Sequence, residues 1–430
     1  MHTQRSSGLL LHLTSLPGPF GIGTLGKGGF EFIDYLKAAG QSHWQILPYG
    51  PVTEISGNSP YMSLSAFAGN PLLIDAAQLV GAGFLRPEQV EIPATFSEYL
   101  VDFSAVRDFN EKILARAFLA FRAAGESPPF AAFCQAMEWL DDYALFVALR
   151  EEFHLQPWFA WPEDIGRRKP EALAEYRETL AERILFHKFV QFCFFSQWQI
   201  LWDYAHCHGI RLIGDIPIYV ALDSADVWAN QECFLLDRET GQPTHVAGVP
   251  PDYFSDTGQR WGNPLFKWYS DRGVLNASLL AWWGQRFRHI CQTVDVVRID
   301  HFRGFEAYWQ IPASEETAVN GEWIKGPGLP FFNEMKKHLG ALPIIAEDLG
   351  VITPEVELLR DNLGFPGMKV LQFAFDSDEH NAYLPHNYTT VNCVVYTGTH
   401  DNDTTLGWYF SDTVMQSSKA RALRYAHSQP

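Results

Sequence analysis

Seven short apolar segments, flanked by glycine and proline, recur along the chain and limit its fold more than any other feature. They cover residues 8–17, 43–52, 209–220, 294–302, 343–350, 368–375 and 392–402. Continuous apolar segments that alternate with helical sequence are typical of parallel strands buried on both faces. The helical segment 331–340 ends in Gly340, directly before the next strand, as in a strand–helix–strand unit. The pattern therefore predicts an α/β fold with a parallel sheet.

The charge of the chain excludes several classes of partner. It has 32 lysine and arginine residues against 50 aspartate and glutamate residues, a formal net charge of −18. Nucleic acids and anionic membrane surfaces both attract basic patches, so we expect neither as a partner. The six cysteines form no Cys-x-x-Cys pair, which argues for reduced thiols and against a zinc site. The sequence shows no signal-peptide pattern and no apolar run of transmembrane length, so we expect a cytoplasmic protein.

Charged residues stand at the ends of four predicted strands. Alternate residues of a strand share a face, so Arg298 and Asp300 of VDVVRID lie side by side at the end of their strand. Glu347 ends the strand PIIAEDLG, whereas its neighbour Asp348 faces away and we interpret it as structural. The other strand-end residues are Asp215, His400 and Asp401. Buried charges must be paired or functional, so we expect these four ends to converge on one site.

Two kinds of chemistry use several carboxylates at strand ends. In glycosyl transfer, one carboxylate is the nucleophile and another is the acid/base. In a metal-assisted barrel enzyme, the carboxylates hold Mg²⁺. A fixed cation at Arg298 competes with a metal, and it lowers the pKa of Asp300 as a nucleophile requires. The 14 tryptophans suit the faces of sugars. We therefore favour glycosyl transfer over a magnesium-dependent lyase.

Several longer motifs in one order resemble a known family. They are HLTSLPGPFGIGTLG (12–26), GNSPYMSLSAFAGNPLLID (57–75), GDIPIYV (214–220), PPDYFSDTGQRWGNPLF (250–266), RIDHFRG (298–304), AEDLG (346–350) and TGTHDND (397–403). They closely resemble the 4-α-glucanotransferases, the amylomaltases of glycoside hydrolase family 77 in the α-amylase clan. The resemblance spans nearly the whole chain. It implies a (β/α)8 TIM-type barrel with large, mostly helical insertions, 4-α-glucanotransferase activity, and no metal or organic cofactor.

The resemblance also implies roles for individual residues. Asp300 corresponds to the nucleophile, Glu347 to the general acid/base, and Asp401 to the carboxylate that stabilises the transition state. The positions that correspond to substrate-binding residues are Arg298, His400, Asp215, Tyr61, Tyr253, Asp256 and Trp261. The implied substrates are maltooligosaccharides and other α-1,4-glucans, with glucose as an acceptor. A retaining α-1,4-glucan hydrolase with the same carboxylates is the nearest alternative, and a non-catalytic glucan-binding protein is a more distant one.

The barrel divides the chain into five predicted segments. They are barrel strands 1–2 in 1–52, a largely helical insertion in 53–208, strand 3 in 209–220, a loop-rich insertion in 221–275 with an irregular active-site cover at 250–266, and strands 4–7 in 276–430. Only the 27 residues from Thr404 to Pro430 follow the last motif, fewer than the roughly 30 of a strand–helix unit. We therefore expect the chain to end before the eighth strand. His12 and His43 lie in predicted core strands, where we expect their polar atoms to be satisfied.

Overall fold

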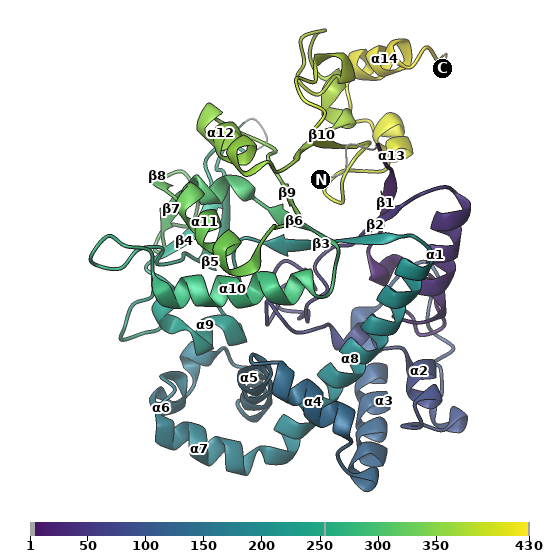
Figure 1. Cartoon of the computed structure of the whole chain (residues 1–430), viewed down its shortest axis with the longest axis vertical. Coiled ribbons are helices and arrows are strands. Elements are labelled where there is room, and N and C mark those ends of the chain that lie inside the picture. The colour runs from purple at the N-terminus through teal and green to yellow at the C-terminus, as the bar shows by residue number, and fades with distance from the viewer. Residues whose placement is uncertain (1–4, 253–254, 429–430) are drawn as a thin grey trace.

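A parallel sheet forms the centre of the molecule (Figure 1). The computed structural model describes residues 5–252 and 255–428. Five strands follow one another in sequence order, and each is parallel to its neighbour. They are β1 (Gly8–Leu10), β2 (His43–Gln45), β3 (Arg211–Pro217), β6 (Val296–Asp300) and β9 (Ile344–Ala346). Parallel strands added in sequence order are the expected arrangement of a TIM-type fold.

Two further parallel strands form a small sheet beside this one. β10 (Gly367–Val370) pairs with β11 (Cys393–Tyr396), and the Ala346 amide donates to the Pro366 carbonyl at 2.9 Å, which places β10 beside β9. All seven predicted strands are therefore present, and the α/β prediction is confirmed. Within residues 5–252 and 255–428, no strand pairs with β11 on one side and β1 on the other, so the strand hydrogen bonds do not close a barrel.

Helix α10 (Ala277–Cys291) shows how the sequence covers this sheet. The Asn276 side chain caps its first turn by accepting from the Ser278 and Leu279 amides. The apolar face of α10 then packs on β6, where Val297 and Ile299 are fully buried. The opposite face of β6 carries the charged residues of RIDHFRG, as the alternation of a strand requires. The other helices that flank the strands are α1 (Lys27–Ala38), α11 (Gly328–Leu339), α12 (Pro354–Leu363), α13 (Thr405–Phe410) and α14 (Gln416–Tyr425).

Most of the helices between β2 and β3 form a layer at the opposite end of the molecule from α13 and α14 (Figure 1). They are α2 (Ala76–Gly81), α3 (Phe103–Ala124), α4 (Pro128–Ala136), α5 (Leu140–Glu152), α6 (Glu163–Gly166), α7 (Pro170–Thr179) and α8 (Ala181–Cys207). The long helix α8 contacts α1, α3, α4, α5 and α7. Aromatic pairs such as Phe121 and Phe189, with ring centroids 4.7 Å apart, fill the interior. Within the described residues, no helix is both long enough and apolar enough to cross a membrane.

An antiparallel sheet lies beside the parallel one, in the order β5-β4-β7-β8. Its strands are β4 (His245–Val249), β5 (Gln259–Pro264), β7 (Ala307–Pro312) and β8 (Glu322–Lys325), and the short helix α9 (Ala225–Ala229) precedes them. The prediction of an irregular loop throughout 250–266 is wrong for Gln259–Pro264. This stretch becomes a strand because β4 pairs with it on one side and with the distant β7 on the other.

Candidate active site

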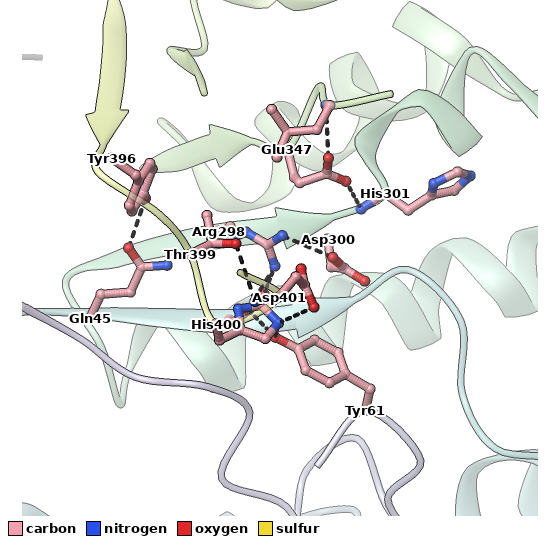
Figure 2. Close-up of polar contacts among 12 residues, drawn as sticks. Gln45, Tyr61, Arg298, Asp300, His301, Glu347, Tyr396, Thr399, His400 and Asp401 are labelled. Carbon is pink, nitrogen blue, oxygen red and sulfur yellow. Dashed lines mark hydrogen bonds and ion pairs between the residues drawn. The ribbon is translucent and has the colours of Figure 1, made fainter. Parts of the chain in front are cut away.

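The charged ends of β3 and β6 meet through one guanidinium group (Figure 2). Nη1 of Arg298 lies 2.9 and 2.7 Å from the two carboxylate oxygens of Asp215. Nη2 of the same residue lies 3.0 Å from Oδ1 of Asp300. The side chains of Arg298 and Asp215 are 2% and 0% exposed, whereas that of Asp300 is 31% exposed. Arg298 is therefore a buried cation that holds two carboxylates, and only Asp300 presents an accessible face.

Glu347, at the end of β9, is held by the backbone on both of its oxygens. Oε2 accepts from the His301 amide at 2.7 Å, and Oε1 accepts from the Leu349 amide at 2.8 Å. His301 has a left-handed backbone with φ of 53°, an uncommon conformation for a residue other than glycine. It directly follows Asp300, so one peptide unit links the two carboxylates (Figure 2). The backbone therefore holds the Glu347 carboxylate beside Asp300, and Arg298 holds the Asp300 carboxylate.

The two carboxyl groups have different proton affinities. Burial, followed by the charge of Asp300, raises the pKa of Glu347 from 4.5 to about 7. Burial raises the pKa of Asp300 to about 6, against the opposing effect of Arg298 and with the help of Asp215 and Asp401. Arg298 lowers the pKa of Asp300, as the sequence predicts, but desolvation outweighs the ion pair and the net shift is upward. At neutral pH Asp300 is still mostly ionised, while Glu347 is protonated in about half of the molecules.

Tyr61 and His400 form a wall beside Asp215. The Tyr61 hydroxyl donates to Oδ2 of Asp215 at 2.8 Å and lies 2.8 Å from Nε2 of His400. The two rings stack with centroids 5.3 Å apart and planes 13° apart. A tyrosine has one hydroxyl proton. Because Tyr61 uses it in the hydrogen bond to Asp215, its hydroxyl oxygen accepts a hydrogen bond from Nε2 of His400. Burial raises the pKa of Tyr61 and lowers that of His400, which keeps both rings neutral.

The other predicted site residues lie at different distances from this cluster. Asp401 follows β11 with its side chain 70% exposed, and its Oδ1 lies 3.2 Å from Nε2 of His400. Trp261, on β5, meets the His301 ring edge-on with centroids 4.8 Å apart. Asp256 is exposed to solvent, and among the described residues no hydrogen bond or ion pair links it to the carboxylates. Tyr253 lies outside the described residues.

Comparisons with known proteins identify the family. The family model described as 4-alpha-glucanotransferase, Glyco_hydro_77, matches residues 11–430. The chain belongs to this family. The chain is 54% identical to a 4-alpha-glucanotransferase of Synechocystis, an alignment that covers 95% of this chain and 81% of the relative. It is 51% identical to a 4-alpha-glucanotransferase of Thermus thermophilus, with 99% and 83% covered.

A solved member of the 4-alpha-glucanotransferase family shows the same fold. The amylomaltase from Streptococcus agalactiae, in complex with acarbose, is 40% identical and superposes with a TM-score of 0.92 over 99% of this chain and 85% of that one. The amylomaltase of Corynebacterium glutamicum is 18% identical, with a TM-score of 0.70 over 97% of this chain and 59% of that one, and supports the fold alone. The chain is therefore an α/β protein of TIM type.

The structure also draws attention to histidines that the sequence analysis did not place in the site. His301 carries the amide that holds Glu347. His12 precedes a 3-10 turn rather than lying in a strand, and within the described residues its Nδ1 is buried without a hydrogen-bond partner. The expectation that His12 is a satisfied core histidine is therefore wrong. Burial and nearby His400 lower the pKa of His12 to about 4. The sequence offered one indication of a role for His301, which is its position next to Asp300.

Asp348 behaves as the sequence predicts. Its Oδ1 accepts from the Met368 amide at 2.7 Å, which ties β9 to β10. Its Oδ2 pairs with Arg360 of α12. Asp348 therefore joins two strands and a helix on the far face of β9, while Glu347 faces the cluster. The interpretation of Asp348 as structural is confirmed.

Proposed function

We propose that this chain moves a segment of α-1,4-glucan from a donor maltooligosaccharide to the 4-hydroxyl of an acceptor glucan or glucose. The observation that carries the proposal is the pair of unlike carboxyl groups, joined through one peptide unit. Asp300 is paired with a cation and partly accessible, and Glu347 is buried with a pKa of about 7. A retaining glycosidase needs these two states side by side, one carboxylate as nucleophile and one acid as proton donor.

In the first step, an oxygen of Asp300 attacks the anomeric carbon of the donor. The bond from that carbon to the glycosidic oxygen breaks, and Glu347 gives its proton to the departing 4-oxygen. The product is a glycosyl ester on Asp300 and a shortened glucan. In the second step, Glu347 as carboxylate removes the proton of an incoming 4-hydroxyl, whose oxygen attacks the ester. This step restores both carboxyl groups and gives a new α-1,4 bond.

The surrounding residues suit the charge that develops on the sugar. We propose that Asp401 stabilises the positive charge of the oxocarbenium-like transition state and binds sugar hydroxyls. Arg298 keeps Asp300 and Asp215 oriented, as their short contacts require. Tyr61 and His400 offer a flat, neutral wall, and stacking on such a wall suits the apolar face of a sugar ring.

Transfer rather than hydrolysis requires that water be kept from the glycosyl ester. We propose that the β4–β5 hairpin and the 250–266 segment cover the site, with Trp261 as a stacking surface for the glucan and with Tyr253 and Asp256 in the covering segment. A ring in edge contact with His301 supports this position for Trp261. The hydrolase alternative uses the same carboxylates and differs only in the acceptor. The acarbose bound to the Streptococcus agalactiae relative supports a sugar ligand in either case.

Product analysis with maltotriose tests the proposal. We expect the wild-type chain to give glucose together with glucans longer than maltotriose, whereas a hydrolase would convert the pool to shorter sugars. Asp300→Ala should abolish both products, and Asp348→Ala provides a control carboxylate on the far face of β9. Full activity in the presence of a chelator would remove the magnesium-dependent alternative. Wild-type activity in Asp300→Ala would contradict the assignment of the nucleophile.

A further inference from the structure

The segment that carries Tyr61 is held in place from outside the cluster by one buried carboxylate. Oδ2 of Asp226, on helix α9, accepts from the Ala66 amide at 2.7 Å. Oδ1 of the same carboxylate accepts from the indole nitrogen of Trp282 at 3.2 Å. The Ala225 amide donates to the Leu64 carbonyl at 2.9 Å. Helix α9 is thereby tied to the segment just after Tyr61 by two hydrogen bonds.

Helix α10 supplies the other half of this arrangement. Trp282, Arg286 and His289 are spaced four and three residues apart, so they lie on one face of the helix. Arg286 donates to the carbonyls of Pro217 at 2.6 Å and Ile218 at 3.2 Å, directly after Asp215 on β3. His289 reaches the Phe67 carbonyl with its Nε2 at 2.8 Å. One helix face therefore contacts the segment after Tyr61 and the end of the strand that carries Asp215.

The polar residues that connect α9 and α10 to the segment after Tyr61 are buried. Asp226, Arg286 and His289 are 4%, 2% and 7% exposed. The charge of Arg286 acts on Asp226, and it offsets part of the rise in pKa that burial imposes on that carboxyl. Buried charges are costly unless they are paired and hydrogen-bonded. An apolar core would be the simpler way to join α9 and α10, so the buried carboxylate of Asp226 requires a specific explanation.

Packing alone does not hold the Tyr61 segment against β3. A cavity of about 40 Å³ lies between them, and its lining includes Tyr61, Ser63, Asp215 and Arg286. A segment beside such a space can shift into it when an anchor is lost, because no atoms oppose the movement. The hydroxyl of Tyr61 must reach both Asp215 and His400 at 2.8 Å. A displacement of about 0.8 Å along either bond would lengthen it beyond hydrogen-bond range.

We propose that Asp226 is a positioning residue that fixes Tyr61 against Asp215 through the Ala66 amide, with Trp282 holding the carboxylate in place. Asp226 touches neither the substrate nor the reacting atoms. This inference rests on the proposed function, in which Tyr61 lines the sugar at the cleavage site. It predicts that the effect of Asp226 on catalysis passes through Tyr61.

A double-mutant cycle tests this route. Asp226→Asn should lower kcat/KM for maltotriose about tenfold, because the new side chain carries no charge near Arg286 and has one acceptor oxygen instead of two. In a Tyr61→Ala background the same substitution should change kcat/KM by no more than about twofold, since residues that act through one another are not additive. An undiminished tenfold effect in that background would overturn the inference.

The chain contains a matched control three residues away. Asp223 also accepts from a backbone amide, that of Trp158 at 3.2 Å, and pairs with Arg150 at 2.9 Å. It faces Arg150 of α5 and the turn at Trp158 rather than the Tyr61 segment. Asp223→Asn should lower thermal stability to a similar degree as Asp226→Asn and leave kcat/KM within about twofold of wild type. An equal loss of kcat/KM in both variants would show that Asp226 acts through general stability, against the inference.

Amide hydrogen exchange separates this inference from the proposed function. Asp226→Asn should speed exchange in residues 63–68 relative to wild type and Asp223→Asn, whatever reaction the chain performs. Trp282→Phe removes one donor to Asp226 and should have a smaller effect in the same direction. Unchanged exchange in both Asp226→Asn and Trp282→Phe would overturn the inference that Asp226 anchors the Tyr61 segment. Absence of transfer activity in the wild type would instead reject the proposed function and leave the anchor to be judged by exchange.

Discussion

Replacing Arg298 by methionine removes the cation shared by Asp215 and Asp300 while it keeps most of the apolar stem. At the 3.0 Å separation from Asp300, an effective dielectric of about 20 gives an attraction of roughly 5 kcal/mol. The Asp300 side chain is 31% exposed, and solvent screening lowers the useful part to about 2–3 kcal/mol. Since about 1.4 kcal/mol is a factor of ten, the proton affinity of Asp300 should rise on the order of a hundredfold.

This change should appear in the pH profile of kcat/KM with maltotriose. Wild-type Asp300 has a pKa of about 6, so in Arg298→Met it is largely protonated at neutral pH and unable to attack. We expect activity at pH 7 to fall about tenfold from this protonation, because a proton affinity raised about a hundredfold leaves roughly a tenth of Asp300 ionised at that pH. Arg298 also lowers the pKa of Glu347, so both limbs of the profile should move to higher pH. Stability should change less than turnover, because the stranded carboxyl groups can take up protons.

Arg360→Met is the matched control for this experiment. Arg360 is also a poorly exposed arginine, at 11%, and it pairs with Asp348 on the far face of β9. Its loss should lower the free energy of unfolding and leave the pH profile where it is. A drop of less than about threefold in Arg298→Met, with an unmoved profile, would refute the reasoning and make Arg298 a purely structural residue.

Three further predictions concern the carboxylates and the covering hairpin. The pKa of Glu347 is raised from 4.5 to about 7 in the folded state, so this group costs stability as pH rises through that window. Relative to wild type, Glu347→Gln should therefore gain up to about 3 kcal/mol in free energy of unfolding between pH 4.5 and about pH 8. A difference in free energy of unfolding that stays constant with pH in denaturant titrations would contradict the shift. Trp261→Ala should weaken the use of long donors more than turnover of activated short ones, whereas Trp323→Ala in the same antiparallel sheet should affect neither, and equal losses with both donors would favour a core role for Trp261. Transfer should retain the α configuration, because retaining enzymes hold the two carboxyl groups about 5–5.5 Å apart; a first product of β configuration, detected by NMR, would exclude a covalent intermediate on Asp300.

The sequence was sufficient for the parallel strands and for the polar ends that meet. Alternation in VDVVRID separates Val297 and Ile299 from Arg298 and Asp300, and the structure has the same two faces. This succeeds because the period of a strand is local. The antiparallel sheet was not predicted, because β4 pairs with β7, which follows β6 in the sequence. Such a partner cannot be read from a short stretch that mixes polar and aromatic residues.

Local sequence patterns also did not reveal the pKa values of the site or the contacts that hold Tyr61 in place. The pKa of Asp300 depends on burial by distant residues, and the effect of this burial outweighs that of its neighbour Arg298. Tyr61 entered the predicted site only through the resemblance, because its partners Asp215 and His400 lie 154 and 339 residues away in sequence. Asp226 looked like any aspartate of an irregular segment. Its role follows only from contacts with the Ala66 amide and Trp282.

The backbone link between the two carboxylates has a consequence for how such an enzyme can diverge. The Glu347 amide bonds to the Ile299 carbonyl, the Phe302 amide bonds to the Glu347 carbonyl, and the His301 amide bonds to the carboxylate itself. Because main-chain atoms make these bonds, exchanging side chains elsewhere leaves the spacing unchanged. Substitutions that accumulate in the β4–β5 hairpin can alter chain-length preference or water access separately from stereochemistry. New acceptor preferences can therefore be sought by randomising the β4–β5 hairpin while the ends of β6 and β9 are left unchanged.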